Sequence, residues 1–482
     1  MKNLFTLIFS IAVVGLIAQT DNRDYLITAA NSAMMTDAEA GIDYTHEGFI
    51  INKSIDPIIS YDVVMTEGAN SWTKSYTGVD IKSGDAHKYK MDESVIVAGS
   101  KEYTVTITNV NGDPSSDVDQ TDNSDTFVLN EYTKLHPDRG VLAEEATGTW
   151  CPWCPAGTVY MDEMSKRFPN NFIGVAVHNQ DNMVEIGYNA AITSFPGFTG
   201  FPQVVVQRVS VIPPSNIPNS ILPMMNIPPP AALSVGAEIS GNLITTSLQV
   251  DFLNNVSGAF NVAIIITEDG VTGTDADLFY QLNNYSFGQN GEMGGYEILP
   301  YEVPAAFNEF NHVGRKLVSG FKGTPQAIDA NSYTAGMTDG WVFTEAFLPS
   351  DVDMNNLHII GILTDRISGA IMNATQASIS DAVANGLFDN TSTRDVFDAN
   401  LAKVYPNPIT DAANIVLNLD NAADVNITII NSLGQAVATR SYGQQSGSVT
   451  LQQDMSSLAA GMYMINITAG DRFITKKVNK VN

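Results

Sequence analysis

The chain of 482 residues contains two cysteines, and both lie in the motif Cys151-Pro152-Trp153-Cys154. A Cys-X-X-Cys motif that opens a helix suits thiol–disulfide exchange, because unpaired N–H groups of the first helical turn stabilise a thiolate on the first sulfur. The second cysteine then attacks a mixed disulfide formed on the first and releases the product. Pro152 and Pro155 both fall in the predicted first turn, where a missing N–H donor costs little. The spacing predicts a redox-active pair, with Cys151 as nucleophile and Cys154 as resolving residue.

A Cys-X-X-Cys pair is also half of many zinc sites, which need two further ligands. The sequence has no third cysteine, and its six histidines are scattered over several predicted domains. His178 ends a predicted strand and could lie near the sulfurs, yet one histidine does not complete a tetrahedral set. We therefore favour a polar strand-end role for His178, and we predict no metal and no cofactor at the cysteines.

Two further residues support redox chemistry. Glu145 lies six residues before Cys151, at the end of the predicted buried strand Val141–Ala143. A carboxyl group at that place could relay the proton of the resolving thiol. Trp150 immediately precedes the first cysteine and could shield one side of the site.

The elements that must position these residues form a predicted α/β unit over residues 135–228. Strands alternate with helices in this segment, a pattern typical of an α/β arrangement. The sequence predicts strands at 141–143, 172–177 and 203–207, and helices at 156–168, 186–193 and 219–225. The pair Pro229-Pro230 then marks a stiff boundary.

Segments of period-two alternation flank the α/β unit on both sides, so the chain is predicted to be multidomain and mainly β. Residues 21–134 predict an immunoglobulin-like β-sandwich, with Tyr61–Met65 as an example of the alternation. Residues 229–380 predict a second, larger β-sandwich, with Val262–Ile266 as one of its strands. Residues 381–400 are predicted to be a linker.

A loop in the first sandwich is rich in aspartate. Asp113, Asp117, Asp119, Asp122 and Asp125 fall within thirteen residues and could bind calcium. The loop lacks the glycine and terminal glutamate of an EF-hand. We favour a solvated acidic loop.

The string from Trp150 to Cys154, followed by Phe201-Pro202 before a β-run, resembles the thioredoxin fold. The longer string Glu144-Glu145-Ala-Thr-Gly-Thr-Trp-Cys-Pro-Trp-Cys-Pro resembles the outer membrane protein 28-like family of thioredoxin-fold surface proteins. In that family an α/β domain precedes a β-sandwich, which matches residues 136–380. The resemblance implies a cis peptide bond before Pro202 that faces the cysteines.

From these features we predict a substrate platform beside the cysteines, made of Trp150, Trp153, Phe201 and Pro202. The motif departs from thioredoxin in having Pro152-Trp153 where thioredoxin has Gly-Pro. The middle dipeptide tunes the reduction potential, so the direction of electron flow stays open.

The C-terminal segment differs from the rest in charge. Residues 399–482 carry six basic and five acidic side chains, whereas the whole chain carries 24 and 52, a formal net charge of −28. The acidic excess therefore lies before residue 399, and the break marks a separate module. The charge of the whole chain repels phosphate groups, so we expect neither a nucleic acid nor an anionic membrane as partner.

Four sequence blocks in this segment resemble a type IX secretion C-terminal sorting domain, predicted over residues 401–482. The blocks are Val404–Pro408, Asn431–Gln435, Leu458–Tyr463 and Lys476–Val478. The resemblance implies a small β-sandwich that the secretion machinery of the outer membrane reads and usually removes near the linker. The residues that carry the signal are Tyr405, Pro406, Asn407, Pro408, Gly434, Gly461, Tyr463, Lys476 and Lys477.

The N-terminus predicts export through the inner membrane. Met1-Lys2-Asn3 precedes the apolar run Leu4–Ala18, a pattern typical of a secretory signal peptide over residues 1–18. The run is shorter than the roughly 20 residues that span a bilayer, and no later run is long enough. We expect a protein that is secreted or displayed on the outer surface and does not span the membrane.

Two functions fit this sequence. The first is a thiol–disulfide oxidoreductase acting on a protein thiol or disulfide substrate. The second is a surface binding or adhesion protein, in which the α/β unit is a scaffold with a structural disulfide and the sandwiches bind a surface ligand. A half-exposed Cys151 would favour the first function, and a buried Cys151 would favour the second.

Overall fold

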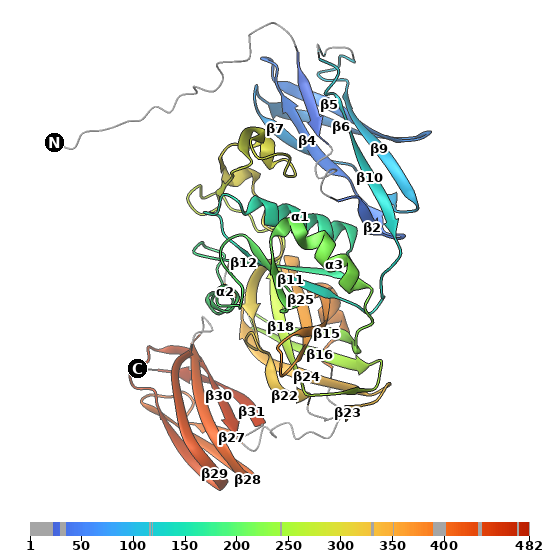
Figure 1. Ribbon diagram of the computed structural model, residues 1–482. Helices are drawn as coiled ribbons and strands as arrows, with labels where there is room; N and C mark the ends of the chain where they lie inside the picture. Colours follow the sequence, from blue (N-terminus) through green and yellow to red (C-terminus); the bar gives the residue numbers. More distant parts are fainter. Residues whose placement is uncertain are drawn as a thin grey trace, which may run out of the picture. The chain divides into compact units, whose positions relative to one another are not determined.

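A computed structural model describes residues 23–481 except 29–34, 115–116, 118, 242, 329–331, 350, 389–401, 432–435 and 470–471. The predicted signal peptide therefore lies outside the described residues. The chain is a multidomain, mainly β protein (Figure 1). It divides into two compact units, the first comprising residues 1–133, 166–168 and 283–303 and the second the remaining residues. No helix among the described residues is long and apolar enough to cross a bilayer.

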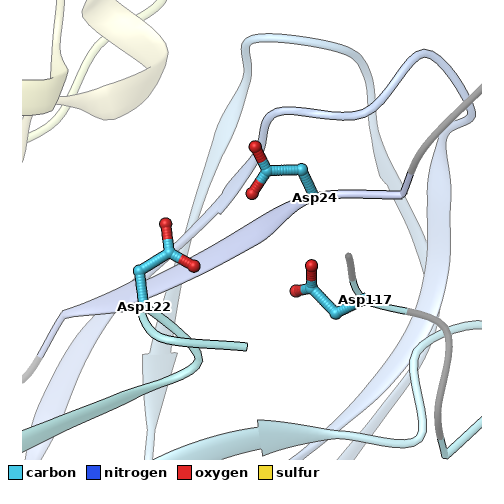
Figure 2. A group of neighbouring side chains, drawn as sticks. All are labelled: Asp24, Asp117 and Asp122. Atoms are coloured by element: carbon cyan, nitrogen blue, oxygen red, sulfur yellow. The ribbon is translucent and has the colours of Figure 1, made fainter. Parts of the chain in front are cut away.

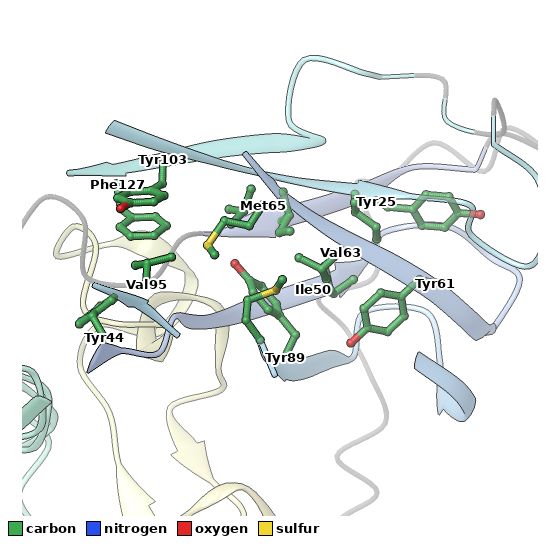
Figure 3. Close-up of a cluster of buried hydrophobic side chains, with 14 of the residues drawn as sticks. Tyr25, Tyr44, Ile50, Tyr61, Val63, Met65, Tyr89, Val95, Tyr103 and Phe127 are labelled. Atoms are coloured by element: carbon green, nitrogen blue, oxygen red, sulfur yellow. The ribbon is translucent and has the colours of Figure 1, made fainter. Parts of the chain in front are cut away.

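Two of the β-sheets in the first unit share a core. A five-stranded sheet has the order β2 (Asp37–Glu39), β10 (Ser124–Tyr132), β9 (Ser100–Thr108), β5 (Ile58–Glu67) and β6 (Asn70–Ile81). A three-stranded sheet has the order β1 (Tyr25–Thr28), β4 (Glu47–Asn52) and β7 (Ala86–Lys90). Figure 3 shows the core, which includes Tyr25, Ile50 and Tyr89 from one sheet and Val63 and Tyr103 from the other.

A mixed nine-stranded sheet forms the centre of the second unit. Its order is β14 (Ser210–Ile212), β13 (Gln203–Val206), β11 (Val141–Thr147), β12 (Phe172–His178), β21 (Val313–Leu317), β18 (Phe260–Glu268), β25 (Leu357–Asp365) and β26 (Ile371–Ser378), and β22 (Thr324–Ile328) also pairs with β18. The strands predicted in residues 141–207 are all present. Parallel pairing of β12 with β21 carries the sheet from the predicted α/β segment into the second predicted sandwich. The domain bounds at 134 and 228 stay predictions.

A second layer covers part of this sheet. Strands β15 (Ala231–Ser240), β16 (Leu243–Phe252) and β24 (Thr338–Phe347) form an antiparallel sheet. Val235, Leu248 and Phe343 from this layer share a core with Ile264 and Ile359 of the central sheet. Alternating apolar side chains produce this packing, because successive side chains of a strand point to opposite faces.

Helices cover the α/β part of the central sheet on both faces. The helices are α1 (Pro155–Arg167), α2 (Ile186–Thr193) and α3 (Ile217–Met225), as predicted (Figure 1). Neighbouring residues of β11 show that α1 and α2 lie on opposite faces. Glu144 bonds to Tyr188 of α2, whereas Glu145 faces Gly157 of α1.

The linker predicted over residues 381–400 stays a prediction. Helix α4 (Ile379–Asn385) occupies its first residues. Ile379 and Ala382 are buried, and the Ser378 hydroxyl accepts the Asp381 N–H at 3.1 Å as a helix cap. The pattern Ser378-x-x-Asp381 is a helix-start signal that the polar composition of the segment concealed. The rest of the predicted linker lies largely outside the described residues.

The tail forms a five-stranded sheet with its own core. Its strands are β27 (Ala402–Tyr405), β28 (Ala412–Asn431), β29 (Ala436–Asp454), β30 (Gly461–Ala469) and β31 (Arg472–Lys480). Ile415, Ile427 and Ile465 belong to this core. The predicted β-rich C-terminal module is confirmed.

Candidate thiol–disulfide site

The cysteine motif forms a turn between β11 and α1. Cys151 N–H donates to the Gly148 carbonyl at 3.0 Å, and Cys154 N–H donates to the Cys151 carbonyl at 3.2 Å. The Cys154 carbonyl accepts the Thr158 N–H at 3.3 Å, so helical bonding begins at Cys154 and Pro155 is the first helical residue. Pro152 was predicted to lie in the first turn of the helix. It precedes the helix instead, because the Cys154 N–H closes a separate turn on the Cys151 carbonyl before the helix begins at Pro155.

Cys151 and Cys154 form a disulfide, and both are buried. Relative exposure is 2% for Cys151 and 0% for Cys154. A segment 130 residues further along the chain, β19 (Gln281–Leu282), bonds to the turn. Gln281 Nε2 donates to the Cys151 carbonyl at 3.0 Å, and Leu282 N–H donates to the Thr149 carbonyl at 2.9 Å. The segment contributes to the cover over the cysteine motif, and sequence reasoning missed it.

Aromatic side chains lie beside the motif. The Trp150 ring meets the Phe201 ring edge-on, with 5.3 Å between ring centroids, and Phe201 meets Phe198 at the same separation. The Trp150 indole N–H donates to the Asn179 carbonyl at 2.6 Å, which fixes the orientation of the ring. The peptide bond between Phe201 and Pro202 is cis, as predicted. Trp153 in the turn is 44% exposed.

Glu145 lies on β11 and is buried. Its Oε1 atom has no hydrogen-bond partner among the described residues. A Cβ added to Gly157 of α1 would lie 1.7 Å from Oε1, so glycine leaves the space that the carboxyl group occupies. Burial raises the pKa of Glu145 to about 8; the nearby charge of Asp162 adds to this, and a hydrogen bond with Thr147 opposes it. The group is therefore poised to gain and lose a proton near neutral pH.

A small cavity lies next to the Glu145 side chain. It leaves about 10 Å³ for the centre of a water-sized molecule, about the space of one water. The polar residues that line it include Glu145, Thr147, Asp162, His178, Gln281 and His312. They come from β11, α1, β12, the segment over the motif and the loop before β21.

His178 is buried and hydrogen-bonded on one side of its ring. Nδ1 lies 2.7 Å from Asp181 Oδ2, and both side chains are buried. Asp181 Oδ2 also accepts the Thr149 N–H at 3.1 Å, two residues before Cys151. The sequence placed His178 at a strand end, which is correct, but did not reveal that it shares a cavity with Glu145.

His312, which also lines the cavity, belongs to a second polar group. Its Nε2 atom lies 3.2 Å from Ser165 Oγ and 3.4 Å from Asp162 Oδ1. The backbone N–H of His312 donates to Asp269 Oδ1 at 2.6 Å. Burial alone would raise the pKa of Asp269, but the His358 and His312 side chains and that N–H lower it to about 2.

The acidic loop of the first unit brings two of its five predicted carboxylates together. Asp117 and Asp122 meet Asp24, with one oxygen of each within 4.8 Å of the others (Figure 2). Asp122 pairs with Lys53, and Asp117 accepts the Tyr25 N–H at 3.1 Å. Burial raises the pKa of Asp24. Asp24 was absent from the predicted set because it lies 93 residues from Asp117 in sequence.

Three of the four sorting blocks meet at strand β31 of the tail. The Asn407 side chain accepts the Asn479 N–H at 2.8 Å. Gly461 and Tyr463 of β30 pair with Lys480 and Val478. Tyr405 ends β27, Pro406 and Pro408 flank Asn407, and Lys476 and Lys477 lie on β31 itself. Gly434 lies outside the described residues.

Residues 403–480 match the sequence model of the secretion system C-terminal sorting domain. The chain carries a type IX sorting tail. It is therefore an exported protein, secreted or held at the cell surface, and the sorting tail implies that the type IX secretion machinery is a partner.

No curated protein matches the chain. Solved structures that it resembles include a protein of Agrobacterium tumefaciens, at 12% identity, covering 50% of this chain and 94% of that one, with a TM-score of 0.29. A CARDB domain from Pyrococcus furiosus, solved with di-metal ions, is 11% identical over 24% of this chain and 99% of that one, with a TM-score of 0.18. A bacterial ice-binding adhesin is 9% identical over 96% and 98%, with a TM-score of 0.15. These scores are too low to carry an argument about fold or function.

Proposed function

We propose that this exported protein is a thiol–disulfide oxidoreductase whose working group is the Cys151–Cys154 pair. The observation that carries the proposal is Glu145, a buried carboxyl group whose Oε1 atom has no hydrogen-bond partner among the described residues. Leaving a buried polar atom unpaired costs about 1–3 kcal/mol. A structural disulfide does not require a buried carboxyl group nearby. A resolving thiol must lose its proton, and a carboxylate can accept that proton.

In the reducing direction, the Cys151 thiolate attacks one sulfur of a substrate disulfide and the other substrate sulfur leaves as a thiolate. Cys154 then gives its proton to the Glu145 carboxylate and attacks Cys151. The Cys151–Cys154 disulfide forms, the second substrate thiolate leaves, and the substrate has gained two electrons. The oxidising direction is the reverse. The pair itself carries the electrons, so the reaction needs no cofactor.

We also propose that residues 135–228 form a thioredoxin-like domain related to the outer membrane protein 28-like family. The order of strands and helices supports this proposal. The parallel strands β11 and β12 are joined through α1, β13 pairs antiparallel with β11, and the Cys-X-X-Cys turn immediately precedes α1.

A surface binding protein with a structural disulfide is the second candidate. It is favoured by the 2% and 0% exposure of the two cysteines and by the bonds from Gln281 and Leu282 over the turn. A covered disulfide cannot react with a folded protein unless its cover moves. The two candidates therefore differ in whether the pair can be cycled.

The reduction potential of the pair in the full chain separates the candidates, together with a turnover assay on the disulfides of insulin. For an oxidoreductase we expect a potential between about −120 and about −270 mV, the range of catalytic dithiols, with turnover lost in Cys151→Ser. A potential below about −300 mV without turnover would mark a structural disulfide and support the binding protein.

A further inference from the structure

We infer that His178, held by Asp181, exchanges a proton with Glu145 through a single water in the cavity between them. The inference rests on the proposed oxidoreductase function and adds a second proton-carrying residue to it. His178 acts through Glu145, so it is a positioning residue for the proton. From the sequence, His178 was predicted to be only a polar residue at a strand end.

The cavity supplies the geometry for this exchange. It has room for about one water, and a buried water needs two to four polar partners. Oε1 of Glu145, which has no partner among the described residues, is one such partner. His178 lines the same cavity from the neighbouring strand, because Glu145 pairs with Ala176 and Thr147 pairs with His178 in the β11–β12 register.

His178 is the lining residue best prepared to accept the proton. Its Nδ1 atom is occupied by Asp181 at 2.7 Å, which leaves Nε2 as the exchanging nitrogen. A carboxylate on one ring nitrogen stabilises the imidazolium that forms when the other nitrogen is protonated. His312, the other histidine in the wall, already has its Nε2 atom near Ser165 and Asp162.

The titratable groups around His178 come from four elements. Glu145 faces the cavity from β11, Asp162 from α1 and His312 from the loop before β21, while Asp181 bonds to the ring from the loop after β12. Asp181 also holds the Thr149 N–H. The proton on His178 is therefore linked by one hydrogen-bonded carboxylate to the turn that carries Cys151.

The proton step balances without any further reagent. When Cys154 closes the disulfide, its thiol proton moves to the Glu145 carboxylate. The Glu145 carboxyl group gives that proton to the cavity water, which simultaneously gives one of its own to His178 Nε2. Glu145 is then a carboxylate again, the water is unchanged, and the imidazolium–Asp181 pair holds the proton until solvent removes it.

The decisive experiment is an infrared titration of the Glu145 carboxyl band in the full, oxidised chain, which requires no enzymatic turnover. Glu145→Gln identifies the band by its loss. We expect a two-step titration in the unmodified chain, because two interacting groups titrate as a coupled pair. His178→Asn keeps a donor toward Asp181 but carries no exchangeable charge, and we expect a single step. His136→Asn, a histidine outside the cavity, should retain both steps.

Identical titration curves for the unmodified chain and His178→Asn would overturn the inference. If His178→Asn does not fold, as judged by its thermal unfolding, His178→Gln takes its place in the same comparison.

A rate measurement tests whether the exchange serves the reaction. We expect His178→Asn to slow closure of the disulfide about tenfold at neutral pH, a small part of the roughly 10²–10⁴-fold typical of acid–base catalysis. The equilibrium constant with a reference dithiol should stay unchanged, since a proton carrier alters the rate only. If His178→Asn titrates in a single step but closes its disulfide as fast as the unmodified chain, the inference is also overturned. If the unmodified chain shows the two-step titration of Glu145 but no turnover, the proposed oxidoreductase function fails and the proton exchange with His178 does not.

Discussion

The residue on which the site depends is a buried carboxyl group in a space that only glycine leaves open. Glu145 and Gly157 face each other from β11 and α1, and a Cβ on Gly157 would lie 2.1 Å from Glu145 Cδ. Oε1 of Glu145 has no partner among the described residues, and burial raises the pKa of this group to about 8. A substitution at Gly157 therefore tests whether the Glu145 side chain occupies this space.

Gly157→Ala should destabilise the protein by about 1–3 kcal/mol, the usual cost of overpacking a core. In an unstrained helix the same change would stabilise the protein by about 0.5–1 kcal/mol. The sign of the change in unfolding free energy therefore shows whether the added methyl group meets Glu145. Urea unfolding of the full chain measures it. Gly200→Ala is the matched control, because a Cβ there meets nothing within 4 Å. A stabilised Gly157→Ala variant would mean that Glu145 does not occupy this space.

The pH dependence of stability should change in Glu145→Gln. The pKa of Glu145 rises from the ordinary 4.5 to about 8 on folding. The folded state therefore keeps a proton that the unfolded state loses, and stability decreases as pH rises from about 4.5 to about 8. Urea unfolding at pH 5 and pH 8 should show a larger loss for the unmodified chain than for Glu145→Gln. Equal losses would contradict the raised pKa.

At the scale of elements, the two-residue strand β19 is bonded to the turn that carries the cysteines. Gln281 and Leu282 of β19 bond to the Cys151 and Thr149 carbonyls. The disulfide lies at the start of α1, where helix N–H groups would favour a thiolate, yet its sulfur atoms are covered. We therefore expect the reactivity of the pair to depend on how readily this segment leaves the turn.

Gln281→Ala should speed the reduction of the disulfide by a small thiol reagent. Loss of one hydrogen bond of about 1 kcal/mol corresponds to roughly a fivefold change in the population of the uncovered state. The measurement is the rate of reduction by dithiothreitol, followed by mass spectrometry after alkylation. Gln249→Ala, which removes a side-chain bond to Asp251 on β16, is the control. Equal rates in both variants would show that the segment does not limit access.

At the scale of the whole molecule, the chain combines an acidic body with a nearly neutral tail. Residues 399–482 contain six basic and five acidic side chains and match a secretion sorting domain. The tail has a hydrophobic core of its own. We therefore expect its role in delivery to be separable from the cysteine site.

Removal of residues 401–482 should abolish delivery to the surface while leaving the Cys151–Cys154 site intact. We expect the shortened chain to stay behind the outer membrane, because the type IX machinery reads the tail. Cell fractionation and protease treatment of whole cells measure its location, and the reduction potential of the pair tests the integrity of the site. Surface delivery without the tail would contradict the sorting role.

Local sequence patterns predicted much of this protein. The Cys-X-X-Cys spacing, the strands at 141–143 and 172–177 and the sorting blocks depend on residues close together in the chain. Alternation and motif spacing report such neighbours directly. Glu145 was also identified from the sequence, because its distance from Cys151 along a strand and turn is a local quantity.

Tertiary structure decided the remaining features. The cover over Cys151 comes from Gln281, 130 residues away, and the cavity beside Glu145 joins residues of five separate segments. The pairing of β12 with β21 carries one sheet across a predicted domain boundary. Burial and proximity depend on segments that are far apart in the chain, and a local pattern contains no information about which of them will pack together.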